Sequence, residues 1–325
     1  MANDINNEGN ISSLEPLPEN KSSFSEIIRN KCLYVDKTEM IHKIITGPRA
    51  PYFLARPRGF GKTLLLDTFH DVFEGRKELF EGLKIAKLKY DWKSYPVIRI
   101  DMSGFNADPN EFQGDLTTEL NAIANTQHEI DLKARNHVSA LRQLIHWLSY
   151  QHRHSGQSGL SDKSDDNRRN VVILIDEYDA PILANIVDDK KCEAIRKILH
   201  NFYRVIKAQY RFVRTAFITG ITSFKRLSLF SDFNNMFDIS FESDFSTICG
   251  FTGDELRTSF RNHLVSALKI QENERYVQSG SSIETLVAKI LSRYDVYSFD
   301  GIHNVLNPYS IVSFFAEKKF GDQYQ

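Results

Sequence analysis

The chain has 325 residues, enough for one α/β domain of about 200 residues or more and a smaller second lobe. Apolar residues make up 41% of it and aromatic residues 12%, which provides for a sizeable core and excludes a chain disordered throughout. The 41 Lys and Arg nearly balance the 42 Asp and Glu, so overall charge does not hold the chain on nucleic acid or an acidic membrane. Any nucleic-acid contact must be local.

The N-terminal residues and the cysteines bear on the compartment. Residues 1–20 are polar, lack the basic-then-apolar order of a signal peptide, and are expected to form a disordered tail. Cys32, Cys192 and Cys249 lie far apart and form no C-x-x-C pair, so we expect reduced thiols. No apolar run approaches membrane-spanning length. We expect a cytoplasmic protein without a membrane partner, with a nuclear location as the alternative.

From residue 21 onward, helices and strands are predicted to alternate. Asp36 is a suitable N-cap for a helix, because apolar residues follow it at helical spacing. A strand at 51–55 precedes a glycine-containing loop and a helix over 62–74. Further strands are predicted at 96–101, 171–175, 212–219 and 236–240, and further helices at 138–150 and 195–206. This alternation predicts an α/β fold with a mainly parallel, doubly wound sheet.

The remaining segments suggest how the chain is divided. The polar segment 155–169 is expected to be an exposed, mobile loop. Beyond Gly250, residues 252–255 have the form of a capping box, and the chain to Gln325 reads as mostly helical. We therefore expect a tail at 1–20, an α/β core at 21–250 and a helical C-terminal lobe at 251–325.

The loop after the first strand carries the ending of a phosphate-binding motif. In such loops, backbone N–H groups and a helix N-terminus surround phosphates, Lys adds charge and Ser or Thr binds Mg²⁺. Gly61-Lys62-Thr63 supplies this ending, and Gly59 also allows close backbone approach. The full motif has Gly where this chain has Arg56, so an ordinary loop before a helix is the alternative. The order of strand, loop and helix favours a nucleoside triphosphate site, with ATP and Mg²⁺ as the expected ligands.

A second motif lies at the end of the strand at 171–175. A Walker B element needs a carboxylate there to hold Mg²⁺, and a neighbouring Glu to orient the attacking water. Asp176 and Glu177 fit these positions, although strands often end in solvated acids. The strand at 96–101 intervenes between the two motifs, which indicates the additional-strand, catalytic-glutamate class of P-loop NTPase. We expect Lys62 to hold phosphates, Thr63 and Asp176 to hold Mg²⁺, and Glu177 to act as the base.

Other polar residues have weaker roles. Thr219 or Thr222 could sense the γ-phosphate, and simple turn chemistry is an equal alternative. Four basic side chains could stabilise charge on a transferring phosphoryl group: Arg56, Arg58, Lys225 and Arg226. For any one of them, a salt bridge at the exposed surface is the more expected role. Asp179 is expected only to end a local turn.

Asp300 and Glu317-x-Lys319 satisfy a permissive nuclease pattern. That pattern needs its acids on a sheet, whereas residues 314–320 read as helical. Nuclease activity is therefore not expected from these residues.

Six segments share a pattern that occurs in the same order in a known family: 33–38, 52–63, 174–179, 230–235, 250–252 and 307–310. Through these segments the chain resembles the predicted AAA-ATPase-like family of P-loop proteins, which are often fused to a PD-(D/E)xK nuclease-like domain. The family itself uses Arg-Pro-Arg ahead of Gly-Lys-Ser/Thr, and usually has a second basic residue where this chain has Gly59. The resemblance implies an AAA-like core, with Asp36 and Lys37 near the base or ribose. It also implies nucleotide contacts from Arg56, Pro57, Arg58, Gly59, Phe60, Gly61, Lys62, Thr63 and Leu64.

Two functions fit these observations. The first is an ATPase whose nucleotide cycle drives a conformational switch between the core and the C-terminal lobe. The second is a non-hydrolysing nucleotide-binding scaffold or regulator of a partner effector, possibly nuclease-linked. A protein partner would contact the C-terminal lobe in either case, while the sequence assigns neither an oligomeric state nor a nucleic-acid partner.

Overall fold

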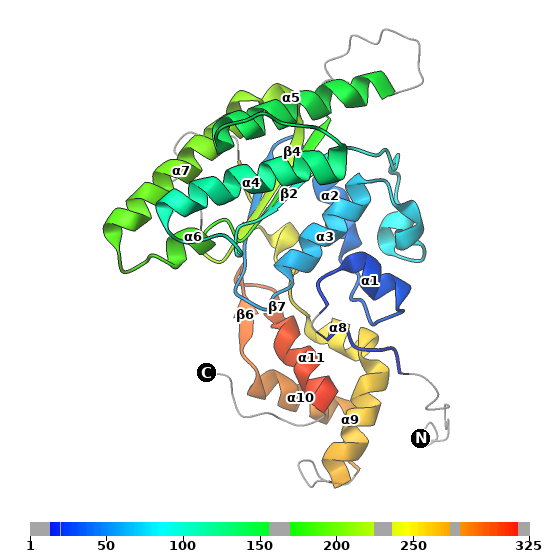
Figure 1. Cartoon of the computed structure of the whole chain (residues 1–325). Helices are drawn as coiled ribbons and strands as arrows, with labels where there is room; N and C mark the ends of the chain where they lie inside the picture. Colours follow the sequence, from blue (N-terminus) through cyan, green and yellow to red (C-terminus); the bar gives the residue numbers. More distant parts are fainter. Residues whose placement is uncertain (1–13, 20, 156–169, 224–235, 274–279, 318–325) are drawn as a thin grey trace.

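A computed structural model describes residues 14–19, 21–155, 170–223, 236–273 and 280–317 (Figure 1). Several expectations lie outside these ranges and stay predictions. They concern the tail at 1–13, the loop at 156–169, the cations Lys225 and Arg226, the segment 230–235, and Lys319.

The core is built on one sheet of parallel strands in the order β2-β3-β4-β1-β5. The strands are β1 (Pro51–Ala55), β2 (Val97–Asp101), β3 (Val171–Asp176), β4 (Val213–Gly220) and β5 (Phe237–Asp238). All residues of β1 and β3 are buried, as continuous apolar runs in a parallel sheet require. β2 lies between the two motifs in the sequence but is an edge strand, and β4 separates β1 from β3 in space.

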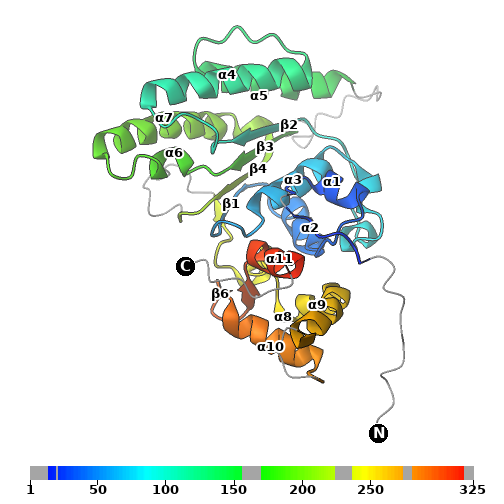
Figure 2. The same cartoon turned by 60° about the horizontal axis from the view of Figure 1, so that its bottom comes forward.

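Helices cover both faces of the sheet, which confirms the α/β class (Figure 2). One face carries α4 (Pro109–His128), α5 (His137–Ser155), α6 (Ala180–Leu183) and α7 (Asp189–Ala208). The other carries α1 (Phe24–Arg29), α2 (Thr38–Thr46) and α3 (Lys62–Phe73). Short 3₁₀ turns occupy Lys77–Phe80, Lys84–Lys87, Tyr210–Phe212 and Ser243–Phe245.

No element is predicted from the sequence at 109–128, where the structure has α4. Its start signal is present, because the Asp108 side chain caps the helix and Pro109 occupies its first turn. Phe112, Leu116 and Leu120 are buried at a spacing of four residues. Polar residues occupy most other positions, so the apolar stripe is narrow and the helical pattern in the sequence is weak.

The C-terminal lobe packs its own apolar core below the sheet (Figure 1). It contains α8 (Gly253–Ser259), α9 (Arg261–Asn273), α10 (Ile283–Arg293), the hairpin strands β6 (Val296–Ser298) and β7 (Asn304–Leu306), and α11 (Pro308–Glu317). The predicted capping box of Thr252 and Glu255 is present. The hairpin is not predicted from the sequence, because its strands have only three residues each.

The chain ahead of α1 takes part in the packing. Leu33 and Val35 join the core of the C-terminal lobe, and Leu17 packs against it. The Leu33 N–H donates to the Pro16 carbonyl over 2.9 Å. Pro16 and Leu17 belong to the tail expected from the sequence, and both contact residues beyond position 20.

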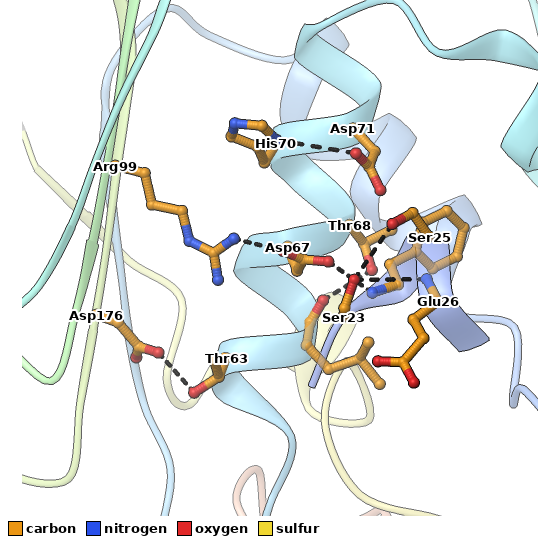
Figure 3. A network of polar contacts seen from close by, with 12 residues as sticks. Ser23, Ser25, Glu26, Thr63, Asp67, Thr68, His70, Asp71, Arg99 and Asp176 are labelled. Atoms are coloured by element: carbon orange, nitrogen blue, oxygen red, sulfur yellow. Dashed lines mark hydrogen bonds and ion pairs between the residues drawn. The ribbon is translucent and has the colours of Figure 1, made fainter. Parts of the chain in front are cut away.

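A polar network fixes α3 to its neighbours (Figure 3). The Phe24 N–H at the start of α1 donates to Asp67 Oδ2 over 2.6 Å, and Arg99 of β2 pairs with Asp67 Oδ1. Asp67 lies one turn after Thr63 on the same helix. The network therefore holds the start of α3 in a defined position relative to the sheet.

Candidate functional site

The loop between β1 and α3, residues 56–61 and called here the glycine loop, presents unpaired backbone donors. Gly59 and Gly61 have φ values of +78° and +84°, in the left-handed region that favours glycine. The carbonyls of residues 56–59 all accept hydrogen bonds. In contrast, the N–H groups of residues 58–64 have no hydrogen-bond partner within the described part of the chain. Backbone donors that converge at a helix N-terminus in this way can surround an anion.

Lys62 adds positive charge to the same place. Its side chain is 5% exposed, and its Nζ donates to the carbonyls of Arg56 and Pro57 over 3.1 and 3.2 Å. Among the described residues, the hydrogen bonds of the ammonium go only to these two neutral carbonyls, so an anionic ligand would add a counter-charge in direct contact with it.

Thr63, Asp176 and Thr219 meet beside the glycine loop. The Thr63 hydroxyl donates to Asp176 Oδ2 over 2.6 Å (Figure 3), and the Thr219 hydroxyl donates to Asp176 Oδ1. Three separate elements, α3, β3 and β4, supply these side chains. A hydroxyl and a carboxylate are hard oxygen ligands of the type that Mg²⁺ prefers, so the donor set fits this ion.

Glu177 follows Asp176 in a strained conformation. Its φ is +47°, in the left-handed region, which is uncommon for a residue with a side chain. Burial raises the pKa of its carboxyl, and Lys62 opposes that shift. A carboxyl with a raised pKa is better matched to proton transfer near neutral pH.

Asp179 joins the chain after β3 to the chain after β4. Its buried carboxylate accepts from the N–H groups of Ile221 and Thr222, the second over 2.6 Å. The Tyr178 hydroxyl donates to the Thr222 carbonyl. Asp179 therefore does more than end a local turn, and Thr222 contacts Tyr178 and Asp179 through its backbone. A second acid shortly after Asp176-Glu177 was the available sequence signal.

A cavity of about 550 Å³ adjoins these groups, within the usual size range of ligand sites. The N-terminal segment, the glycine loop, the start of α3, Glu177 and α11 line it. The residues that contribute include Pro18, Lys21, Arg58, Gly59, Gly61, Lys62, Thr63, Leu64, Glu177, Tyr309, Ser313 and Glu317. A smaller, mostly apolar cavity of about 80 Å³ adjoins it and is lined by Tyr34, Lys37, Phe60, Cys249 and others. Pro18, Gly61 and Leu64 line both.

Asp36 and Lys37 have different surroundings. Asp36 Oδ1 accepts from the N–H and hydroxyl of Thr38, and Oδ2 accepts from the Lys84 N–H, so both carboxylate oxygens hold neighbouring segments. Lys37 is 8% exposed, lines the smaller cavity and pairs with Glu255 over 2.6 Å. Burial lowers the pKa of Lys37, and Glu255 opposes that shift.

The Arg56 side chain has a structural position. Its guanidinium is 1% exposed, donates to carbonyls including those of Ala55 and Ser240, and lies 3.8 Å from the centre of the Phe299 ring. Burial lowers its pKa to about 10. Because Arg56 is buried and donates to backbone carbonyls, the expectation of exposed salt bridging is wrong for this residue. Arg56 is also not among the residues that line the larger cavity. The exposed Arg58 does line it.

Asp300 and Glu317 do not share a sheet. Asp300 lies in the turn between β6 and β7 and accepts from Ser243 and His303, whereas Glu317 ends α11.

Among the described residues, no helix combines the length and apolar character needed to cross a bilayer.

Two comparisons with known proteins give the family of the chain. The family model described as "Predicted AAA-ATPase" matches residues 19–230. The chain is also 32% identical over 289 residues to a protein of Azotobacter chroococcum mcd 1 described as "Uncharacterized protein in vnfD 5'region". That alignment covers 88% of this chain and 49% of the relative, so the chain spans about half the relative's length. With the family model covering well over half of its residues, the chain belongs to the predicted AAA-ATPase family.

Proposed function

We propose that this chain binds ATP with Mg²⁺ in the larger cavity. One observation carries the proposal: the unpaired N–H groups of residues 58–64 lie beside Lys62 and the Thr63–Asp176 pair. The phosphates would lie against these N–H groups, and the base would occupy the smaller apolar cavity near Lys37. Thr63 and Asp176 would hold Mg²⁺, which when bound neutralises charge on the phosphate oxygens.

We further propose that the chain hydrolyses ATP. Glu177 lines the cavity, and its carboxylate would orient the attacking water and accept its proton. Thr219 lies one residue before the end of β4, the strand between β1 and β3. Its hydroxyl contacts Asp176 and would sense the γ-phosphate through that contact. The position of β4 between these strands supports the additional-strand, catalytic-glutamate type of P-loop NTPase.

The C-terminal lobe would respond to the nucleotide. α11 lines the cavity, so a ligand there contacts both the core at 21–250 and the lobe at 251–325. We propose that ATP binding and hydrolysis shift the packing of the lobe on the core, as in a conformational switch.

Two substitutions test the proposal by titration calorimetry and a phosphate-release assay. Lys62→Ala removes the buried ammonium and is expected to weaken ATP binding at least about tenfold. Glu177→Gln keeps the shape of the side chain but removes the base, and is expected to bind ATP while turnover falls by about 10²-fold or more.

Glu193→Gln on the exposed surface of α7 is the matched control, and its rate should equal that of the wild type. Equal rates for all variants would contradict the proposed hydrolysis. Tight binding without any turnover would instead favour the non-hydrolysing scaffold.

A further inference from the structure

Asn307, between β7 and α11, connects the C-terminal lobe to the glycine loop. Its Nδ2 donates to the Arg58 carbonyl over 3.0 Å, and its Oδ1 accepts from the Tyr309 N–H over 3.0 Å. The Tyr309 N–H also lies 3.3 Å from the Gly59 carbonyl. The lobe therefore supplies donors to two consecutive carbonyls of the loop.

These contacts fix the orientation of two peptide groups. In a planar trans peptide, the C=O of one residue and the N–H of the next point in opposite directions. With the carbonyls of Arg58 and Gly59 held toward Asn307 and Tyr309, the N–H groups of Gly59 and Phe60 face the opposite side of each peptide plane. Both belong to the set of unpaired donors, so the lobe holds them in place for an anion.

The close approach depends on glycine at position 59. A Cβ built on Gly59 would lie 2.8 Å from Asn307 Oδ1 and 3.0 Å from Tyr309 Cβ, and the φ of +78° strains any other residue. On the other side of the loop, the Arg56 guanidinium lies over Phe299 of the same lobe. The glycine loop is thus held by the lobe at both its start and its middle.

We propose that Asn307 is a positioning residue of the nucleotide site. Its amide sets the glycine loop for phosphate binding, so that docking of the C-terminal lobe and binding of ATP strengthen each other. The inference rests on the proposed function and deepens it. Because coupling is reciprocal, ATP binding must favour the docked lobe by the same factor by which docking favours ATP.

Two substitutions of Asn307 separate this role from capping of α11. Asn307→Asp keeps an oxygen that accepts from the Tyr309 N–H and is an equally good N-cap, but a carboxylate cannot donate to the Arg58 carbonyl. Asn307→Ala loses both contacts without adding charge. Asn304→Ala is the matched control, because Asn304 is exposed in the same lobe and makes no side-chain hydrogen bond in the described structure.

The experiment measures the Kd of ATP with Mg²⁺ by titration calorimetry on the full chain, and the urea midpoint of each variant. If Asn307 positions the loop, both substitutions weaken ATP binding by roughly two- to tenfold. The urea midpoint of Asn307→Asp stays at the wild-type value, and Asn304→Ala matches the wild type in both measurements.

Four results would overturn the inference. An unchanged Kd in Asn307→Ala, with a lowered urea midpoint, would leave only the capping role. Weakening in Asn307→Asp alone would show an effect of added charge. Absence of ATP binding in the wild type would overturn the proposed function as well. If Lys62→Ala loses ATP binding while both Asn307 variants bind as the wild type does, the proposed function stands and only the role of Asn307 is rejected.

Discussion

Arg56 and Arg58 are two residues apart in the sequence and have opposite surroundings. The Arg56 guanidinium is buried, with Nη1 and Nη2 donating to backbone carbonyls and its central carbon over the Phe299 ring. The Arg58 side chain is exposed at the cavity. A planar fork of donors suits several fixed carbonyls at once, which explains why arginine, rather than lysine, occupies a buried position without a carboxylate partner.

Substitution of each arginine by methionine should separate stability from binding. Arg56→Met leaves buried carbonyls without donors and is expected to lower the free energy of unfolding by about 2–3 kcal/mol. Arg58→Met should change it by less than about 0.5 kcal/mol and weaken ATP binding instead. Urea unfolding and titration calorimetry on both variants check this. An Arg56→Met protein with the wild-type free energy of unfolding would show that the Arg56 side chain does not stabilise the glycine loop.

The ends of β3 and β4 are fitted to each other around Gly220. A Cβ on Gly220 would lie 2.4 Å from the Tyr178 ring and 2.7 Å from Asp179 Oδ1. Tyr178 and Asp179 follow Glu177 and bind the backbone of residues 221–222. The position of Glu177 therefore depends on contacts between two neighbouring strand ends, not on its own strand alone.

Two glycine-to-alanine substitutions provide a matched test of this fit. Gly220→Ala is expected to lower the free energy of unfolding by about 1–3 kcal/mol, because the ring and carboxylate must move. Gly114→Ala in α4 has open space around its Cβ and should raise it by about 0.5–1 kcal/mol. Urea unfolding measures both. A neutral Gly220→Ala would mean that these contacts tolerate displacement.

At the scale of the whole molecule, an ion pair joins the core to the lobe. Lys37, at the start of α2, pairs with Glu255 of α8 through both carboxylate oxygens. Glu255 also accepts from the Thr252 N–H in the capping box. The same residue therefore orders the first turn of the lobe and fixes it to the core.

A double-mutant cycle measures this connection. Lys37→Met should lower the free energy of unfolding by about 2–3 kcal/mol, since it leaves a largely buried carboxylate unpaired. Glu255→Gln retains the capping geometry, and we expect a coupling energy between the two sites above about 1 kcal/mol. The exposed Arg257–Glu284 pair of the same lobe is the control, with an expected coupling below about 1 kcal/mol. Equal coupling in the two cycles would mean that Lys37–Glu255 contributes no more than a surface pair.

The amino-acid sequence by itself determined the regular elements of the core. The continuous apolar run at 171–175 favours a strand that is buried on both faces, and the stripe that includes Leu65, Leu66 and Phe69 favours a helix after the glycine loop. Such patterns are local, so they can be read without knowing what packs against them. The helix-start signals of α8 and α4 are local in the same way, since a capping side chain of each lies next to the first turn.

Only the tertiary structure decided which side chains meet. Strand order is non-local: β4 lies between β1 and β3, and this brings Thr219 to the Asp176 carboxylate that also holds Thr63. Arg56 and Arg58 are the same residue type, so the sequence does not distinguish their roles. Contacts with Ser240 and Phe299 bury Arg56, whereas Arg58 is exposed. The contact of Asn307 with Arg58 spans 249 positions. No local pattern encodes such a contact, because it depends on how the lobe docks.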